Sequence, residues 1–206
     1  MAARVTVAGV ECHPLTPDRW ADLKRLFGER GACEGCWCAF WRLPRARYGA
    51  QKGEANRQAM KALVDTGVAP GVLAYVGGEP VGWCSVGPRE SFPALDQHTR
   101  VLRRVDEKPV WSVVCFYVAK PYRRRGLTVE LLAAAADHAF TRRASILEGY
   151  PVQPKKGKIA DLFACTGLVS AFARAGFVEV GRLSETRPIM RLALGQRPSI
   201  IGQEEQ

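Results

Sequence analysis

One segment constrains the fold more than any other, because it predicts a buried strand that leads through a basic turn directly into a helix. Residues 110–118 are mostly β-branched, aromatic or otherwise apolar, which is typical of a central strand covered on both faces. Arg123–Arg125 and Gly126 follow, and apolar residues at helical spacing then run from Leu127 to about Arg142. This alternation predicts an α/β (α+β) fold in which helices cover a sheet.

Length and composition agree with a globular protein. The chain has 206 residues, of which 47% are hydrophobic and 24% charged, enough to bury a large core. We predict a single domain over residues 1–194 and a flexible C-terminal tail over residues 195–206. The apolar runs are about half the ~20 residues that a transmembrane helix needs. The N-terminus lacks a secretory apolar core, and seven cysteines indicate reduced thiols, so we predict a cytoplasmic protein with no membrane partner.

The remaining elements are predicted from hydrophobic spacing and from residues that end helices or form turns. A Gly-Gly-Glu-Pro turn at 77–80 predicts a hairpin, and the polar stretch 87–109 predicts a long excursion. We expect strands at 10–13, 72–76, 81–86, 146–152, 177–180 and 189–194, and helices at about 17–27, 53–64 and 162–175.

The basic turn has the properties of a pyrophosphate site. The first N–H groups of a helix have no intrahelical partner, and the helix dipole favours negative charge there. Gly126 lets the backbone approach a phosphate closely, while Arg123, Arg124 and Arg125 supply cationic donors. A solvated basic turn is the alternative interpretation.

These residues resemble a known family. Arg123, Gly126 and Thr128 fit the R/Q-x-x-G-x-G/A pyrophosphate loop of the GNAT family of N-acetyltransferases, and Val118 lies at the family's preceding strand end. Arg174–Phe177 resembles the family's helix end before its sixth strand. The resemblance extends to about Leu194. It implies a mixed, largely antiparallel sheet of about seven strands with helices on both faces.

The resemblance also implies a donor, a reaction and a site. The donor would be acetyl-CoA, and its acetyl group would pass to a primary amine by direct attack in a ternary complex. The strand around residues 147–150 would splay from the central strand to admit the thioester. Backbone groups of Phe116, Tyr117 and Val118 would bind the pantetheine arm, and the pyrophosphate would lie against Arg123, Arg124, Arg125, Gly126, Leu127 and Thr128.

Two residues depart from the family pattern. Thr128 replaces the last small residue of the loop, and its hydroxyl could contact phosphate or cap the helix. Phe172 stands where the family often has a tyrosine that protonates the leaving thiolate. A phenyl ring cannot donate a proton, which motivates an alternative function: a non-catalytic acyl-CoA-binding regulatory domain on the same fold.

The amine must lose a proton to a base, commonly a carboxylate. Glu148 is our first candidate, because it lies on the strand expected at the cleft; Glu90 and Asp106 are others. The alternative is that Glu148 is an outward, solvated carboxylate. Trp37 and Trp41 lie where the family lines its acceptor pocket, and they could bind the acceptor or simply pack under the sheet.

Cys33, Cys36 and Cys38, with His13, could form a zinc site. No second cysteine pair matches their spacing, so we predict no metal and ordinary packing.

The net charge is +10, and two segments carry the whole surplus: residues 100–125, with eight Lys or Arg and two acids, and residues 142–158, with five and one. This concentration predicts a small polyphosphate such as acetyl-CoA rather than specific nucleic acid, for which no motif is present. The sequence does not identify the amine acceptor, and it leaves a homodimer open.

Overall fold

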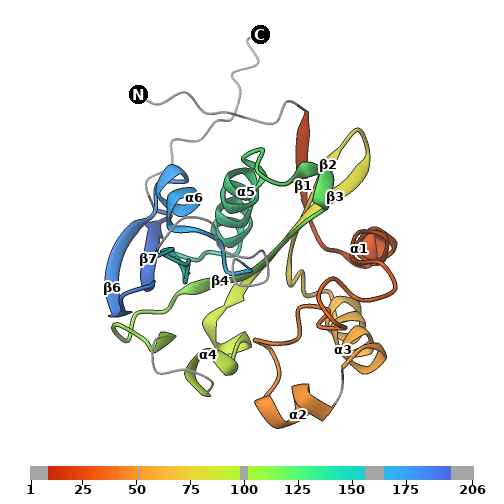
Figure 1. Cartoon of the computed structure of the whole chain (residues 1–206), viewed down its shortest axis with the longest axis horizontal. Helices are drawn as coiled ribbons and strands as arrows, with labels where there is room; N and C mark the ends of the chain where they lie inside the picture. Colours follow the sequence, from red (N-terminus) through yellow and green to blue (C-terminus); the bar gives the residue numbers. More distant parts are fainter. Residues whose placement is uncertain (1–8, 51, 98–101, 156–164, 196–206) are drawn as a thin grey trace.

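The structure is a computed structural model that describes residues 9–50, 52–97, 102–155 and 165–195 (Figure 1). Its centre is a seven-stranded sheet in the order β1-β2-β3-β4-β5-β7-β6. Every neighbouring pair is antiparallel except β4 and β5. The strands are β1 (Val10–Pro14), β2 (Gly71–Val76), β3 (Glu79–Pro88), β4 (Trp111–Val118), β5 (Ile146–Gly149), β6 (Val178–Ser184) and β7 (Arg187–Ala193).

Helices cover both faces of the sheet, which confirms the predicted fold class (Figure 1). The long helix α5 packs across β1–β4 and beside α6, while α1 packs on β3 from the other face. The helices are α1 (Trp20–Phe27), α2 (Arg45–Ala50), α3 (Glu54–Asp65), α4 (Ala94–Gln97), α5 (Leu127–Thr141) and α6 (Val169–Arg174), with 3-10 turns η1 (Pro17–Arg19), η2 (Arg89–Ser91) and η4 (Lys120–Tyr122).

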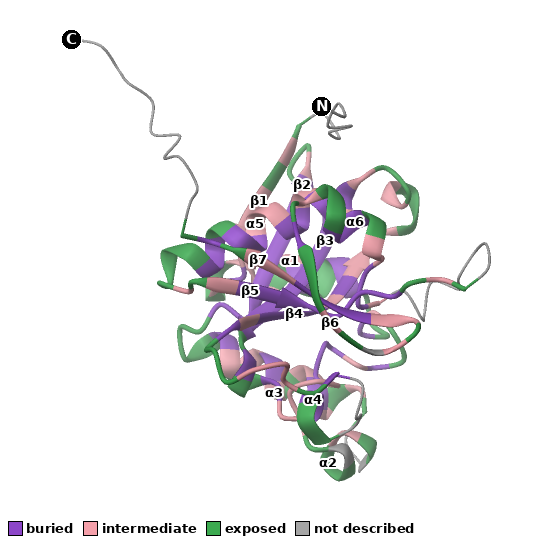
Figure 2. Ribbon diagram, turned by 90° about the vertical axis from the view of Figure 1, so that its left-hand side faces the viewer, coloured by how far each residue is buried: buried purple, intermediate pink, exposed green. Residues whose placement is uncertain are grey.

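The core lies on both faces of the central strands, where Figure 2 shows most of the buried residues. Val113 and Phe116 of β4 face α5 and α6, where they pack with Leu131 and Phe172. Val114 packs on the opposite face. Val113 and Phe116 share a face although they are three residues apart, because a register irregularity opposite Ser85 and Val86 adds one residue to β4 between them.

β4 and β5 pair over only three residues and then separate. The paired positions are Trp111, Ser112 and Val113 on β4, whereas β3 stays paired with β4 as far as Val118. The sheet therefore has an opening on the β5 side of β4, beyond Val113. This is the splay that the family resemblance implied.

The helix predicted at 162–175 begins only at Val169. Residues 156–164 lie outside the described part of the chain, and the following residues form a loop in which Gly167 has φ +87°. Tertiary hydrogen bonds hold this loop: Val152 N–H donates to Gly167 O (2.9 Å), and Val169 N–H donates to Val152 O (3.1 Å). The strand predicted to reach Val152 likewise ends at Gly149, and Val152 forms an isolated bridge with Leu168.

The positive charge is less concentrated in space than in sequence. Arg142 and Arg143 follow the last residue of α5, whereas Arg123–Arg125 precede its first residue. Fifteen helical residues span about 22 Å at 1.5 Å per residue, so the two basic groups lie at opposite ends. The predicted tail falls mostly on residues 196–206, which lie outside the described chain, and the predicted domain boundaries stay a prediction. No helix among the described residues has the length and hydrophobicity to cross a membrane.

Candidate active site

The turn into α5 has the conformation that an anion-binding loop requires. Gly126 caps the helix in the left-handed region, at φ +87°, and Arg124 adopts φ +61° two residues earlier. Val129 N–H donates to Gly126 O (2.8 Å), so the amides of Leu127 and Thr128 precede the first bonded turn. The side chains of Arg124 and Arg125 are exposed beside these amides.

Arg123 differs from Arg124 and Arg125 because its guanidinium bonds to the protein backbone. Its Nε donates to the carbonyl oxygen of Val118 at 2.9 Å, which ties the loop to the end of β4. The structure therefore places at least part of this guanidinium in a structural contact. Arg124 and Arg125 are the better-placed cationic donors for a ligand.

The backbone of β4 beside the opening is already hydrogen-bonded to the chain itself. Phe116 N–H donates to Cys165 O at 2.7 Å, so this amide points away from β3 and into the opening. Backbone groups alternate along a strand, which places those of Val118 on the same side and those of Tyr117 toward β3. Ala119 N–H, which donates to Val81 O (2.9 Å), confirms this alternation. Of the three predicted pantetheine-binding residues, Phe116 and Val118 therefore face the opening.

Glu148 lies at the centre of a buried ionic network, at 1% exposure, so the interpretation as a solvated carboxylate is wrong. One oxygen accepts from Arg89 Nη1 (3.1 Å) and from the Tyr150 hydroxyl (2.6 Å). The other accepts from Arg191 Nε (2.7 Å). The Tyr150 hydroxyl also lies 2.8 Å from Ser112 Oγ. This geometry does not favour Glu148 as a base, because both of its oxygens already accept hydrogen bonds and the buried side chain offers no exposed surface to an amine.

The other two candidate bases are also held by arginines. Asp106 accepts two hydrogen bonds from Arg191 (2.7 and 2.9 Å), and these lower the pKa of Asp106 to about 2. Glu90 accepts from Arg104 Nη2 (2.8 Å), and this hydrogen bond lowers the pKa of Glu90. A carboxylate with a lowered pKa is a weaker base, so neither Asp106 nor Glu90 has the environment of an amine-activating group.

The two tryptophans occupy different environments. Trp37 is 3% exposed and stacks on Trp20, with ring centroids 6.0 Å apart, which favours the packing interpretation. Trp41 is half-buried and packs against the cluster that contains Phe92 and Tyr150. Trp41 therefore keeps an exposed part on the face of the sheet opposite α5.

Phe172, at the position of the family's tyrosine, is part of the core. It is fully buried and packs edge-on against Phe116 and Phe177, with centroids 6.1 and 4.9 Å away. A Cβ at Gly149 would lie 2.1 Å from the Phe172 ring, so the helix α6 packs directly on the end of β5.

The clustered cysteines are free thiols, and no group of three potential ligands among the described residues is placed to hold a metal ion. Cys38 is buried and accepts a hydrogen bond from Trp83 Nε1 (3.1 Å). Sequence reasoning did not bring Cys115 and Cys165 to this region, although Cys115 packs against the cluster that contains Cys38 and Cys165 lies beside β4. It also missed Arg89 and Arg191, because nothing local in the sequence relates them to Glu148.

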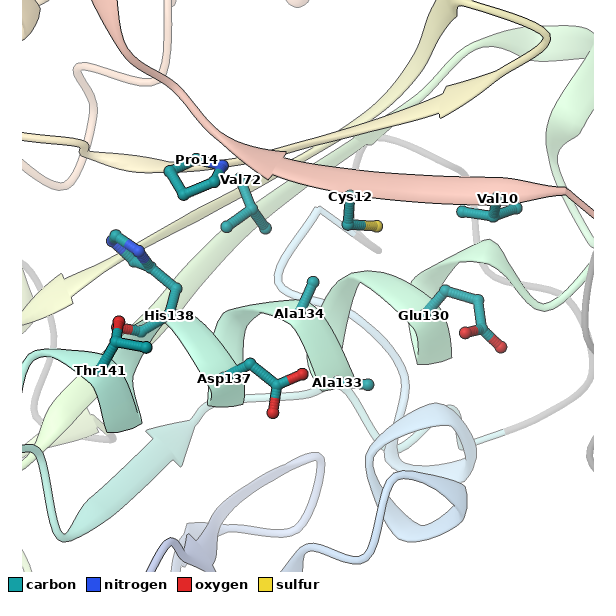
Figure 3. Close-up of a pocket in the computed structure, with 10 residues that line it drawn as sticks. All are labelled: Val10, Cys12, Pro14, Val72, Glu130, Ala133, Ala134, Asp137, His138 and Thr141. Atoms are coloured by element: carbon teal, nitrogen blue, oxygen red, sulfur yellow. The ribbon is translucent and has the colours of Figure 1, made fainter. Parts of the chain in front are cut away.

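Two surface hollows lie away from the splay. One, of about 370 Å³, lies between β1 and α5, with Cys12 and Val72 on one side and Ala134 and Glu130 on the other (Figure 3). The second, of about 680 Å³, lies between α1 and α3. Neither is lined by a residue of β4 or of the loop before α5.

A mixed sheet that splays beside a basic, glycine-capped helix start defines a class of protein: an acyltransferase-type fold. The family model described as "Acetyltransferase (GNAT) family" matches residues 35–154, more than half of the chain. The chain belongs to the GNAT acetyltransferase family.

Solved structures show the same fold at low sequence identity. A GNAT-family acetyltransferase from Streptococcus agalactiae is 12% identical with a TM-score of 0.52, over 90% of this chain and 96% of that one. A GNAT-family acetyltransferase from Listeria monocytogenes is 8% identical with a TM-score of 0.53, over 90% and 95%. The polyamine N-acetyltransferase of Drosophila melanogaster is 12% identical with a TM-score of 0.53, over 90% and 100%. No curated protein sequence matches the chain significantly.

Proposed function

We propose that the protein is an acetyl-CoA-dependent N-acyltransferase, which transfers an acetyl group to a primary amine by direct attack in a ternary complex. One observation carries the proposal: β4 separates from β5 beyond Val113, and a short turn joins the end of β4 to the exposed cationic start of α5. An extended pantetheine arm and its pyrophosphate need these two features next to each other.

The donor would bind as an added strand followed by an anion. The amides of Arg124–Thr128, with the Arg124 and Arg125 side chains, would hold the pyrophosphate. The outward backbone groups of Phe116 and Val118 would pair with the pantetheine amides. The fit requires two exchanges, because Cys165 O must leave Phe116 N–H and Arg123 must share Val118 O. Tyr117 would contribute its side-chain packing rather than its backbone.

The acceptor would approach from the face that carries Trp41, and its neutral amine would attack the thioester carbonyl. The CoA thiolate would then leave and take up the proton that the amine nitrogen loses. An ordinary thiol pKa of about 8.5 makes it a tolerable leaving group without the tyrosine that Phe172 replaces. We assign Glu148 a positioning role. It accepts a hydrogen bond from the Tyr150 hydroxyl, which also contacts Ser112 Oγ, at the point where β5 separates from β4. Trp37 supports the neighbouring loop from within the core.

Calorimetry with acetyl-CoA, followed by release of free thiol in the presence of an amine panel, tests the proposal. Binding together with thiol release and an acetylated amine supports it. Absence of acetyl-CoA binding by the reduced protein rejects it.

The regulatory alternative keeps one specific observation in its favour, the buried Phe172 at the acid position. It predicts acetyl-CoA binding without turnover of any amine. Acetylation of even one amine at a useful rate would reject it.

A further inference from the structure

Three thiols from distant parts of the sequence meet beside the opening in the sheet. Cys115 lies on β4, Cys38 lies in the loop between α1 and α2, and Cys165 lies in the segment just before α6. Phe116, the neighbour of Cys115 on β4, donates its N–H to Cys165 O at 2.7 Å, so the backbone segments that carry Cys115 and Cys165 lie side by side. Cys115 also packs against the cluster that contains Cys38. A disulfide requires Cα atoms within about 7 Å, and a direct backbone hydrogen bond at the residue next to Cys115 brings the two chain segments into that range.

The two thiols of the Cys115–Cys165 pair differ in acidity. The hydrogen bond from Cys115 lowers the pKa of Cys165 to about 7, against the effect of burial, and the charge of Arg187 adds to the lowering. The hydrogen bonds with Cys165 and Cys38, together with burial, raise the pKa of Cys115. Of the two thiols, Cys165 therefore ionises more readily, and Cys115 stays protonated. A thiolate that is partly exposed, as Cys165 is, is the reactive form toward oxidants.

The segment that carries Cys165 lies across the opening. Cys165 O accepts from Phe116 N–H at 2.7 Å on the β4 side, and Gly167 O accepts from Val152 N–H at 2.9 Å beyond β5. Arg187 Nη1 donates to Thr166 Oγ1 (2.9 Å) and holds the segment from β7. The segment from Cys165 to Val169 therefore occupies Phe116 N–H, one of the two β4 positions on which an added strand would pair.

We propose that Cys165 and Cys115 form a reversible disulfide that fixes this segment across the opening and prevents a donor from pairing with Phe116. The second half of the inference rests on the proposed function, whereas the disulfide itself does not. Clustered thiols also bind soft metals, but no group of three ligands among the described residues is placed to hold one.

The oxidant would be a peroxide. The Cys165 thiolate attacks one peroxide oxygen, which gives a sulfenic acid and releases hydroxide. The Cys115 sulfur then attacks the Cys165 sulfur; the S–S bond forms, the sulfenic oxygen leaves as water with the Cys115 proton, and two electrons have passed to the peroxide. A dithiol reductant reverses the bond by exchange.

Limited oxidation with hydrogen peroxide tests the disulfide. The remaining thiols are alkylated, and the digested protein is analysed by mass spectrometry. We expect a peptide pair linked through Cys115 and Cys165, absent from Cys165→Ser and Cys115→Ser. The matched control is Cys12→Ser, a half-buried thiol on β1 outside the cluster, which should keep the linked pair.

Calorimetry with acetyl-CoA, which has no free thiol to reduce the bond, tests the consequence. Oxidised protein should bind at least about tenfold more weakly than reduced protein. Dithiothreitol should restore binding, and Cys165→Ser should show no response to peroxide.

Three results would overturn the inference: no Cys115–Cys165 linked pair, a linked pair with unchanged affinity, or stoichiometric zinc that protects Cys115 from alkylation. If the reduced protein fails to bind acetyl-CoA, the proposed function fails instead, and the linked peptide alone decides the disulfide.

Discussion

Substitution of Glu148 separates its two interpretations, as a base and as a buried ion that holds the site together. Glu148→Gln keeps the shape of the side chain but removes its charge. The change leaves Arg89, which is 1% exposed, with only the partly exposed Asp96 as a charged partner within the described chain. Breaking a buried ion pair from one side costs about 3–5 kcal/mol. We take about 3 kcal/mol, because the glutamine oxygen still accepts the Tyr150 hydroxyl.

For a chain of this length, 1 kcal/mol changes the melting temperature by about 2–4 °C, so Glu148→Gln should melt about 6–12 °C lower. Circular dichroism on heating measures this. The matched control is Glu185→Gln, which removes an exposed pair with Lys155 and should change the free energy of unfolding by less than about 1 kcal/mol. A Glu148→Gln protein with unchanged melting but no turnover would refute the structural interpretation and restore Glu148 as the base.

Three further predictions concern the donor loop, the packing of α6 and the acid range. Arg125→Gln should weaken acetyl-CoA binding by about 1–2 kcal/mol in low salt, whereas Arg142→Gln, at the far end of α5, should leave it unchanged; calorimetry at two salt concentrations decides. Gly149→Ala places a Cβ 2.1 Å from Phe172 and should cost about 1–3 kcal/mol of stability in urea, while Gly49→Ala, whose Cβ meets nothing within 4 Å, should not destabilise. Because the pKa of Asp106 is lower in the folded state, its stabilisation is complete above about pH 4 and disappears as the pH falls toward about 2. The difference in urea midpoint between the wild type and Asp106→Asn should therefore shrink over that range; a constant difference would contradict the pairing with Arg191.

The parts of the fold that the sequence predicted well are those encoded locally. Gly28 ends α1 at φ +65°, and the glycine turn at 77–78 joins β2 to β3. The start of α5 was predicted from Gly126 and the apolar spacing that follows. Each of these signals lies within a few residues of the element that it forms.

The parts that the sequence did not predict depend on residues far apart in the chain. Glu148 is buried because Arg89 and Arg191, which lie 59 and 43 residues away, neutralise it there. Within the helix expected at 162–175, the described residues 165–168 form a loop, because Phe116 and Val152 bind the backbone of this segment. Hydrophobic spacing contains no information about such partners.

The three-residue pairing of β4 with β5 divides the sheet into two parts that differ in cooperativity. β1–β4 form a continuous hydrogen-bonded unit, and β5, β7 and β6 form another; between the strands of these units there are only the pairs from Trp111 to Val113. Amide hydrogen exchange should therefore be fastest, among the central strands, at this boundary, since local opening there breaks the fewest bonds. A donor that binds at Phe116 and Val118 would stabilise the folded state and slow exchange at the same boundary, so ligand binding would strengthen the sheet where its two parts are least connected.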